Sequence, residues 1–505
     1  MKRKNIFWLS LLCTAMLGTL FCACETQSQE QVEESNFQFE ETDGGYAVCG
    51  VKKIEKGKVE IPSVYNDKTV VAIADGAFED EDSLVTVIIP DSVRSVGARA
   101  FADCNKLETI DFGASVATLK EGAFAKCIAI KEISLPQSLT EIGDNAFNGC
   151  GKLKGISIPD NVKSIGDFSF VGCESLKNVE IGDKVERIGQ EAFAENELLL
   201  TVSISESAPL TIGAKAFYEC KALIDVNFGG TVEVGNEAFQ SCSKLAEVVL
   251  GDSCVSVGES AFSSCLHLTG VTVGESVASI GDNAFSSCHT LVEVYNRSAL
   301  DFTVGDTAHG KIARNVLHLY TQEGQSRRFK DEKGVVYYQD GERVIALGQV
   351  GFQTGLDIVL DERTTEVYPM AFYNNLNVSS VTFGAKVQTI GKQAFNFCYQ
   401  LKKIVIGDGV TEIGEKAFNR CSILNMVVLG AGVQKIGTDA FALCELLPTG
   451  NVYYKGNTTA FSRIDFTDGN TELEETPRYY YSEISPSKKG NYWYYDQNGK
   501  IKLWE

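Results

Sequence analysis

One phenylalanine returns about every 23 residues along most of this 505-residue chain, and this period constrains its fold more than any other feature. Residues 141–159, EIGDNAFNGCGKLKGISIP, show the full unit with Phe147 as its anchor. Within two runs the anchors lie 23 residues apart, except that one step of 24 is followed by one of 22, as stacked units with fixed contacts require. The anchors are Phe78, Phe101, Phe124, Phe147, Phe170, Phe193, Phe217, Phe239, Phe262, Phe285, Phe372, Phe395, Phe418 and Phe441.

Other apolar residues keep fixed distances from the anchor. Two of them, such as Val87 and Ile89, follow nine and eleven positions after it, which places both on one face of a short strand. An apolar set this sparse cannot be buried within one unit, so the units must stack and their strands should form a parallel sheet, about 4.8 Å per coil. A glycine four residues before the anchor, as at Gly97, Gly143 and Gly166, is expected to allow the tight turn that closes each coil.

The unit C-x-x-L-x-x-V-x-I-P-x-x-V-x-x-I-G-x-x-A-F resembles the repeat of the BspA-like, or treponemal-type, leucine-rich repeat surface proteins of bacteria. The resemblance covers residues 37–505. It implies a leucine-rich repeat solenoid with a parallel β-sheet, mostly strand and loop, closed by β-hairpin caps, and it implies adhesion or recognition of proteins on host or neighbouring cells. Local departures from the pattern are Lys120 for the glycine, Ser169 for the alanine, and Glu81, Asn196 and Asn375 for the cysteine.

Eleven of the sixteen cysteines occupy one repeat position, three residues after the anchor. Many cysteines in an exported protein usually indicate disulfides, but side chains at one repeat position should point in parallel directions, which does not suit pairing. We therefore predict a ladder of buried free thiols, with redox or metal use as the alternative. The ladder consists of Cys104, Cys127, Cys150, Cys173, Cys220, Cys242, Cys265, Cys288, Cys398, Cys421 and Cys444.

Catalytic and metal-binding motifs contribute little to the interpretation. His267 and His289 lie near Cys265 and Cys288 in the sequence, so a zinc site remains an alternative that would need convergent ligands. No G-x-S-x-G, H-E-x-x-H or phosphate-binding loop occurs. We therefore predict no enzymatic activity, no cofactor and no metal centre.

Residues that alternate with the buried strand positions should line an outward face, which we expect to be concave. This face is rich in carboxylates, and glycosidases use paired carboxylates, but nothing in the pattern builds a deep pocket. Binding is therefore the better prediction. The candidate binding face consists of Asp111, Glu132, Glu180, Asp225, Asn227, Glu247, Glu293 and Tyr295.

The first residues have the pattern of a targeting segment. Lys2, Arg3 and Lys4 precede an apolar stretch too short for a comfortable membrane span, which predicts a signal peptide at 1–23. Residues 20–24, LFCAC, resemble a bacterial lipobox, which implies cleavage before Cys24 and acylation of its thiol; an ordinary signal peptide cut nearby is the alternative. A polar tether would follow to residue 36. This predicts a lipoprotein on the cell surface that touches the membrane only through its lipid anchor.

Segments outside the periodic runs indicate two modules of the same design. Each module has a leading hairpin, an array of coils and an exit cap, with the boundary near residue 328. The predicted order is an N-terminal β cap at 37–62, a first array of ten coils at 63–294, an inter-array cap with the second leading hairpin at 295–366, a second array of four coils at 367–447 and an aromatic C-terminal cap at 448–505.

Composition restricts the partner. A formal net charge of −21 argues against nucleic acid, because no basic surplus exists to neutralise phosphates. The predicted function is cell-surface binding or adhesion to a protein ligand through the solenoid surface. The alternative is a glycan-binding or carbohydrate-active envelope protein that uses the carboxylates or the C-terminal aromatic residues, where GNYWYYDQNGKIKLW resembles one unit of the aromatic cell-wall or choline-binding repeats.

Overall fold

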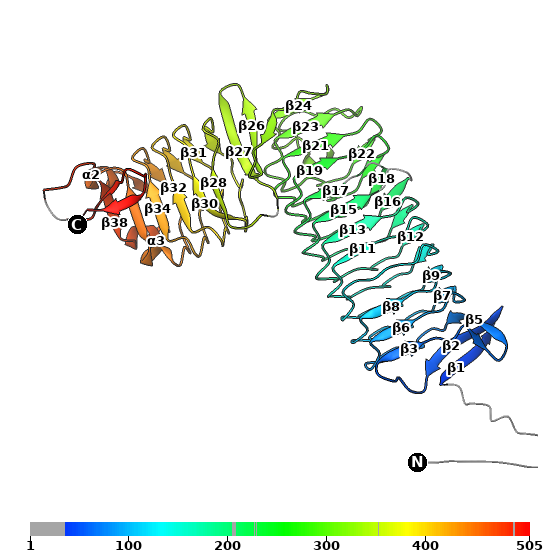
Figure 1. The fold of residues 1–505 in the computed structure, drawn as a ribbon. Helices are drawn as coiled ribbons and strands as arrows, with labels where there is room; N and C mark the ends of the chain where they lie inside the picture. The colour runs from blue at the N-terminus through cyan, green and yellow to red at the C-terminus, as the bar shows by residue number, and fades with distance from the viewer. Residues whose placement is uncertain are drawn as a thin grey trace, which may run out of the picture. The chain divides into compact units, whose positions relative to one another are not determined.

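The computed structural model describes residues 36–204, 209–226, 228, 230–351, 353–487 and 490–504. From residue 37 onward the chain is one compact unit built of stacked coils (Figure 1). The predicted repeat is confirmed, because all fourteen anchor phenylalanines are buried. Within each array the rings of successive anchors stack in parallel, with centroids 4.6–5.5 Å apart.

The predicted parallel strands form the outer ladder of the first array. Neighbouring coils pair in register, so that Ile156 lies opposite Val179 and Val179 opposite Val202. The ladder is divided into three sheets. They are β3 (Lys58–Glu60), β6 (Thr86–Ile88) and β8 (Thr109–Asp111); β11 (Gly155–Ser157), β13 (Asn178–Ile181), β15 (Thr201–Ile204) and β17 (Asp225–Val226); and β19 (Glu247–Val249), β21 (Gly270–Val273), β23 (Glu293–Asn296) and β24 (His318–Tyr320).

A second parallel ladder, here called the inner ladder, was not predicted from the sequence. It joins the same coils at the Ile-Gly pair that precedes most anchors. Most of its strands have only two residues, each ending on a buried aliphatic side chain such as Ile142 or Ile165. The strands are β5 (Lys68–Ile73), β7 (Ser95–Val96), β9 (Thr118–Leu119), β10 (Glu141–Ile142), β12 (Ser164–Ile165), β14 (Arg187–Ile188), β16 (Leu210–Ile212), β18 (Thr231–Val234), β20 (Ser256–Val257) and β22 (Ser279–Ile280).

The glycine before each anchor has a different role from the predicted one. Gly97 and Gly143 do not have positive φ angles. A Cβ atom on Gly143 would instead lie 2.7 Å from the carbonyl carbon of Lys120, so glycine is needed because successive coils approach closely there. The tight turns use positive φ at other positions, such as Asn145 at 58° and Gly149 at 74°.

The two modules begin in the same way. The leading hairpin of the first module consists of β1 (Phe37–Thr42) and β2 (Gly45–Val51), and β2 then pairs in parallel with β5. In the second module β26 (Val335–Asp340) and β27 (Arg343–Gln349) form the equivalent hairpin, and β27 pairs in parallel with β29 (Glu366–Val367). Two further short strands, β4 (Val64–Tyr65) and β25 (Arg328–Lys330), pair with β5 and β26.

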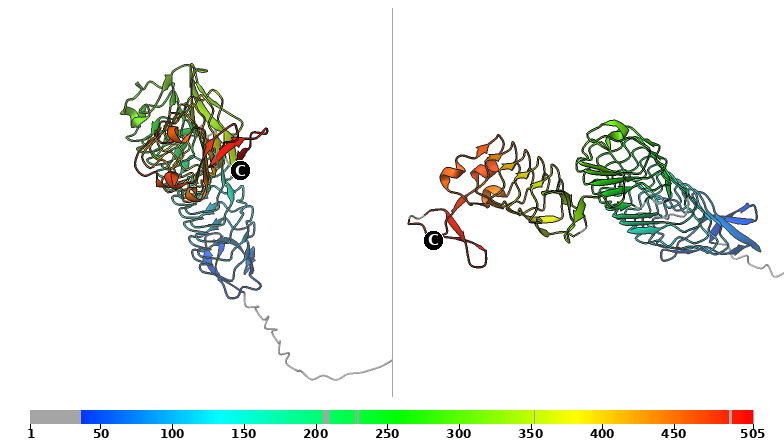
Figure 2. Two further views of the ribbon diagram at one scale, coloured as in Figure 1. Left: turned by 90° about the vertical axis from the view of Figure 1, so that its left-hand side faces the viewer. Right: turned by 90° about the horizontal axis from the view of Figure 1, so that it is seen from above.

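The second array repeats the two ladders with fewer coils, as the turned views also show (Figure 2). Its outer ladder contains β28 (Leu356–Val359), β30 (Val378–Thr382), β32 (Lys403–Val405), β34 (Met426–Leu429), β36 (Asn451–Tyr454), β38 (Arg478–Tyr481), β39 (Tyr492–Tyr495) and β40 (Ile501–Leu503). Its inner ladder contains β27, β29, β31 (Thr389–Ile390), β33 (Glu412–Ile413), β35 (Lys435–Ile436) and β37 (Asp465–Phe466).

Helices occur only as short segments of the exit caps among the described residues. They are α1 (Ala308–Lys311), the 3-10 turn η1 (Leu447–Thr449), α2 (Thr458–Phe461) and α3 (Thr471–Glu475). Within the ranges given above, no helix has the length and apolar composition needed to cross a bilayer.

Each array has its own hydrophobic core. The first extends to Val316 and the second starts at Val335. A small apolar cluster that includes Val292 and Leu347 lies between them. Because the first strand of the second module starts at Arg328, the boundary between modules lies before that residue, after β24 ends at Tyr320.

Candidate functional site

The predicted binding residues occupy two neighbouring rows on the outer ladder of the first array, here called the outer strand face. Glu180 belongs to one row and Asp225 to the other. The 23-residue spacing places Asp111 in the row of Glu180 and Glu132 in the row of Asp225, although the coil of Glu132 has no strand in the outer ladder. All four side chains are exposed, and no ion pair joins them to another described residue. Asn227 lies outside the described residues.

The last coils of this face carry an aromatic pair. Tyr295 is half-buried and stacks on Tyr320 of the next strand, with ring centroids 4.9 Å apart and planes 2° apart. His318 also stacks on Tyr320, with ring centroids 5.1 Å apart. The partial exposure of Tyr295 is consistent with the predicted outward orientation of its side chain.

Glu293 is not part of the exposed face, which corrects the prediction for this residue. Its side chain is only 1% exposed. One carboxylate oxygen accepts a hydrogen bond from the Ser326 hydroxyl at 2.7 Å, and the other accepts one from the Arg327 backbone N–H at 2.7 Å. These donors come from the segment that leads into the second module.

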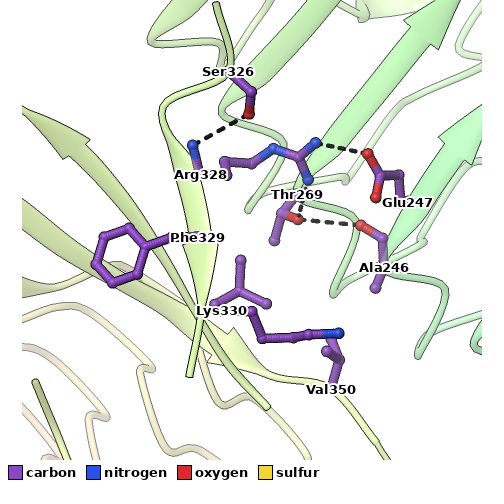
Figure 3. Close-up of a pocket in the computed structure, with 9 residues that line it drawn as sticks. Ala246, Glu247, Thr269, Ser326, Arg328, Phe329, Lys330 and Val350 are labelled. Atoms are coloured by element: carbon purple, nitrogen blue, oxygen red, sulfur yellow. Dashed lines mark hydrogen bonds and ion pairs between the residues drawn. The ribbon is translucent and has the colours of Figure 1, made fainter. Parts of the chain in front are cut away.

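Arg328 explains the burial of Glu293. Its guanidinium binds Glu293 at 2.8 Å. It also binds Glu247 at 2.8 Å and the Thr269 hydroxyl at 3.1 Å (Figure 3). Burial opposes the charge of Arg328, but both carboxylates favour it, and its pKa lies above the usual value. We call this group of four residues the Arg328 bridge.

Gly270 makes room for the bridge. It lies in register between Glu247 and Glu293, and a methyl group on it would overlap the Arg328 guanidinium. The row Glu-Gly-Glu therefore receives an arginine of this same chain instead of an external ligand. The bridge could not be predicted from the sequence, because Arg328 lies 81 residues from Glu247 and outside the repeat period.

A cleft of about 370 Å³ adjoins the bridge, and both modules line it. Figure 3 shows Glu247 and Thr269 on one side of the cleft and the strand that carries Arg328 and Phe329 on the other. The charged side chains of Arg328 and Glu247 beside this cleft pair with each other. We therefore interpret the cleft as part of the contact between the two modules. The residues lining it are Ala246, Glu247, Thr269, Ser326, Arg328, Phe329, Lys330, Val336 and Val350.

The cysteine ladder is confirmed as free and buried. Each thiol donates to the carbonyl oxygen of the anchor phenylalanine one coil earlier, at Sγ–O distances of 2.9–3.4 Å. Asn196 replaces cysteine because its amide donates to the equivalent Phe170 carbonyl at 3.0 Å. Burial raises the pKa of Cys104 and of Cys173 to about 12, so these thiols stay protonated.

The proposed zinc ligands do not converge. Cys265 donates to the Phe239 carbonyl, and the Nδ1 atom of His267 lies 2.6 Å from the Ser243 carbonyl oxygen, so both side chains are directed at backbone groups. Burial lowers the pKa of His267. Within the described part of the chain, no group of three or more His, Cys, Asp or Glu side chains is arranged to hold a metal ion. Cys24, the predicted acylation site, lies outside that part.

The C-terminal aromatic residues form strands, as predicted, but their central ring is not available to a ligand. Trp493 is fully buried, and its indole N–H donates to the Tyr454 carbonyl at 3.1 Å. It packs against Tyr453 and Val428 on the outer ladder of the second array. This position makes Trp493 unavailable to the glycan-binding alternative, whereas Tyr494 and Trp504, whose rings stack 4.1 Å apart, stay partly exposed.

The repeat of this chain matches that of a known protein family. The family model of the BspA type leucine rich repeat region matches residues 56–177, 163–292 and 353–471, which is more than half of the chain. No curated protein sequence matches this chain.

Solved structures of bacterial leucine-rich repeat proteins are also similar. One, from Bacteroides ovatus ATCC 8483, is 25% identical with a TM-score of 0.45, and the match covers 88% of this chain and 98% of that chain. The T. pallidum leucine rich repeat protein TpLRR is 31% identical over 38% of this chain and 89% of its own, with a TM-score of 0.35. A leucine rich cell surface protein from Faecalibacterium prausnitzii A2-165 is 21% identical over 86% and 96%, with a TM-score of 0.33. By the family match, this chain belongs to the BspA type leucine rich repeat proteins.

Proposed function

We propose that the protein is a bacterial surface protein that binds a protein ligand through the outer strand face of the first array, and that it has no catalytic role. The observation that carries the proposal is the set of four exposed, unpaired carboxylates, Asp111, Glu132, Glu180 and Asp225, spread over successive coils of the outer strand face. Side chains that recur on one face of a solenoid present an extended surface of the kind that protein partners cover.

Charge supports a basic partner. The first array, residues 63–294, has 16 Lys and Arg against 34 Asp and Glu, whereas the second, residues 367–447, has seven against five. A surface of one sign accelerates encounter with a partner of the opposite sign and disfavours partners of the same sign. The ligand of the first array should therefore present Lys and Arg.

Attachment to the cell envelope is part of the proposal and rests on sequence. The lipobox-like residues 20–24 support acylation of Cys24, and the polar residues 25–36 would separate the coils from the membrane. Membership of the family supports a surface location.

A matched pair of variants tests the binding face. Glu132→Gln with Glu180→Gln removes two charges from it, and Glu141→Gln with Glu186→Gln removes two from exposed positions at the inner ladder. Full-length protein and both variants would be applied to arrays of extracellular proteins and of glycans. We expect protein hits that weaken at least about tenfold, with reduced salt dependence, only in the first variant.

Two results would count against the proposal. Protein hits that respond equally to both double variants would separate binding from the outer strand face. Hits confined to the glycan array would favour the carbohydrate alternative.

A further inference from the structure

The second array differs from the first at the position two residues after the anchor, where it carries Phe397, Arg420 and Leu443 and the first array carries no large apolar residue. After its anchor phenylalanines, large apolar and aromatic side chains reach the surface, with one arginine among them. We call this set the ridge; it consists of Tyr373, Leu376, Phe397, Tyr399, Arg420 and Leu443. Leu376, Tyr399 and Leu443 are 41%, 39% and 46% exposed, which is high for large apolar residues in a stacked core protein.

Three of these residues, Phe397, Arg420 and Leu443, lie in one column because each is two positions after its anchor. Tyr373, Leu376 and Tyr399 occupy other positions of the coil. The backbone N–H of Phe397 donates to the Asn419 carbonyl at 3.0 Å, and that of Arg420 donates to the Ala442 carbonyl at 2.9 Å. Residues two positions after the anchor are therefore adjacent from coil to coil. In the first array the same positions are small or polar: Asp80, Asp103, Lys126, Gly149, Gly172, Glu195, Glu219, Ser241, Ser264 and Ser287.

The backbone conformation two residues after the anchor is unfavourable for large side chains such as Phe397 and Leu443. Phe397 has a φ of 63° and Leu443 a φ of 60°. This left-handed region suits Gly, Asn and Asp and is costly for bulky residues. At the position two residues after the anchor, the first array mostly uses small or acidic residues. Folding of a coil therefore does not require an aromatic ring at this position. A function of the surface is the remaining physical reason for the ring of Phe397.

The side chains within the ridge contact one another edge to face. Tyr373 and Phe397 have centroids 5.5 Å apart at 67°, and Phe397 and Tyr399 have centroids 6.0 Å apart at 64°. The Arg420 guanidinium lies over the Phe397 ring, 5.2 Å from its centroid. No ion pair joins Arg420 to a carboxylate within the residues that the structure describes, so its charge is available to a partner.

We propose that the ridge is a second binding surface, which takes a polypeptide segment that presents a carboxylate to Arg420 and an apolar side chain to the surrounding rings. Tyr, Phe and Arg together are typical of the residues that dominate protein interfaces. A sugar would need a free, flat ring face, whereas Arg420 covers Phe397 and the neighbouring rings stand at steep angles. The ridge therefore selects an acidic partner, in contrast to the basic partner of the outer strand face.

The test uses phage-displayed random twelve-residue peptides as the probe, selected on the immobilised full-length protein. Enriched sequences would be synthesised and their affinities measured by fluorescence anisotropy against Phe397→Asn, Arg420→Gln and the control Ser241→Asn. Ser241 has the same backbone conformation in the first array, with a φ of 64°. Asparagine tolerates this conformation, so Phe397→Asn should melt at the same or a higher temperature than wild type.

We expect peptides in which Asp or Glu lies beside an apolar residue, bound at least about tenfold more weakly by Phe397→Asn and Arg420→Gln and equally by Ser241→Asn. The proposal is overturned if no peptide is enriched, if the enriched peptides lack carboxylates, or if the ridge variants bind them as wild type does. It is equally overturned if a parallel glycan array yields a hit that Phe397→Asn abolishes.

Discussion

Replacing Arg328 with methionine should weaken the joint between the modules. The change removes the charge of the bridge but retains most of the apolar length of the side chain. Glu293, only 1% exposed, would then be a buried carboxylate without a cation. Losing one member of a buried ion pair typically costs about 3–5 kcal/mol. Since Glu293 keeps hydrogen bonds from Ser326 and Arg327, we expect about 3 kcal/mol, at the lower end of that range.

The assay is thermal unfolding followed by tryptophan fluorescence, because Trp493 and Trp504 both lie in the C-terminal cap and report on the second module. For a unit of that size, about 3 kcal/mol corresponds to a fall in melting temperature of roughly 6–12 °C. Arg328→Met with Glu293→Gln should recover part of this loss, because the amide carries no charge that needs a partner.

Arg297 provides a matched control. It also binds two carboxylates, Asp252 at 3.0 Å and Glu275 at 2.7 Å, but its partners are 52% and 66% exposed. Exposed pairs contribute about 0–1 kcal/mol, so Arg297→Met should shift the transition by a few degrees at most. If Arg328→Met and Arg297→Met gave equal shifts, the bridge would not stabilise the joint and our account of Glu293 would be wrong.

Four further outcomes are expected. Cys24→Ala should release the protein from membranes, since the acyl chains are the proposed anchor; unchanged partition on membrane fractionation would contradict this. Cys150→Ala should destabilise more than Cys150→Ser in urea titrations, because serine can still donate to the Phe124 carbonyl, which alanine leaves without its side-chain donor. The contribution of the ladder thiols to stability should be constant below about pH 8.5 and fall above it by about 1.4 kcal/mol per thiol per pH unit, because burial raises the thiol pKa in the folded state and the unfolded chain ionises first. Alkaline titration followed by circular dichroism measures this, and a flat profile from about pH 8.5 to about pH 10 would disprove it. Residues 37–321 and 322–505 should fold as separate fragments, the second with the lower melting temperature because it has fewer coils; a second fragment that is unfolded alone would show that the modules depend on each other.

Much of the fold follows from the repeat alone. A fixed 23-residue period determines which positions are buried, so the anchors, the thiol ladder and the longer strands could be predicted without a structure. The inner ladder could not, because two residues such as Ser95 and Val96 are too few to show a strand period. The glycine at 97 was placed correctly but explained wrongly, since close approach between coils is visible only in three dimensions.

The candidate site also contains some residues whose exposure could be predicted from the sequence and others whose exposure could not. Exposure of Asp111 and Glu180 follows from alternation within a strand, which is a local property. Burial of Glu293 depends on Arg328, which belongs to a different module and has no place in the repeat. The one local signal in the sequence is Gly270, which lies between two glutamates of its row, and its meaning required the position of the guanidinium.

The bond from each ladder thiol to the carbonyl of the preceding anchor has an evolutionary consequence. Because every coil donates to the one before and accepts from the one after in the same geometry, a whole coil can be deleted or duplicated by recombination without leaving a donor or acceptor unmatched. The length of the array is then free to vary between strains in steps of one coil, while the caps stay constant. Selection can therefore adjust how much binding surface a cell displays through changes in gene length, with no substitution in the core.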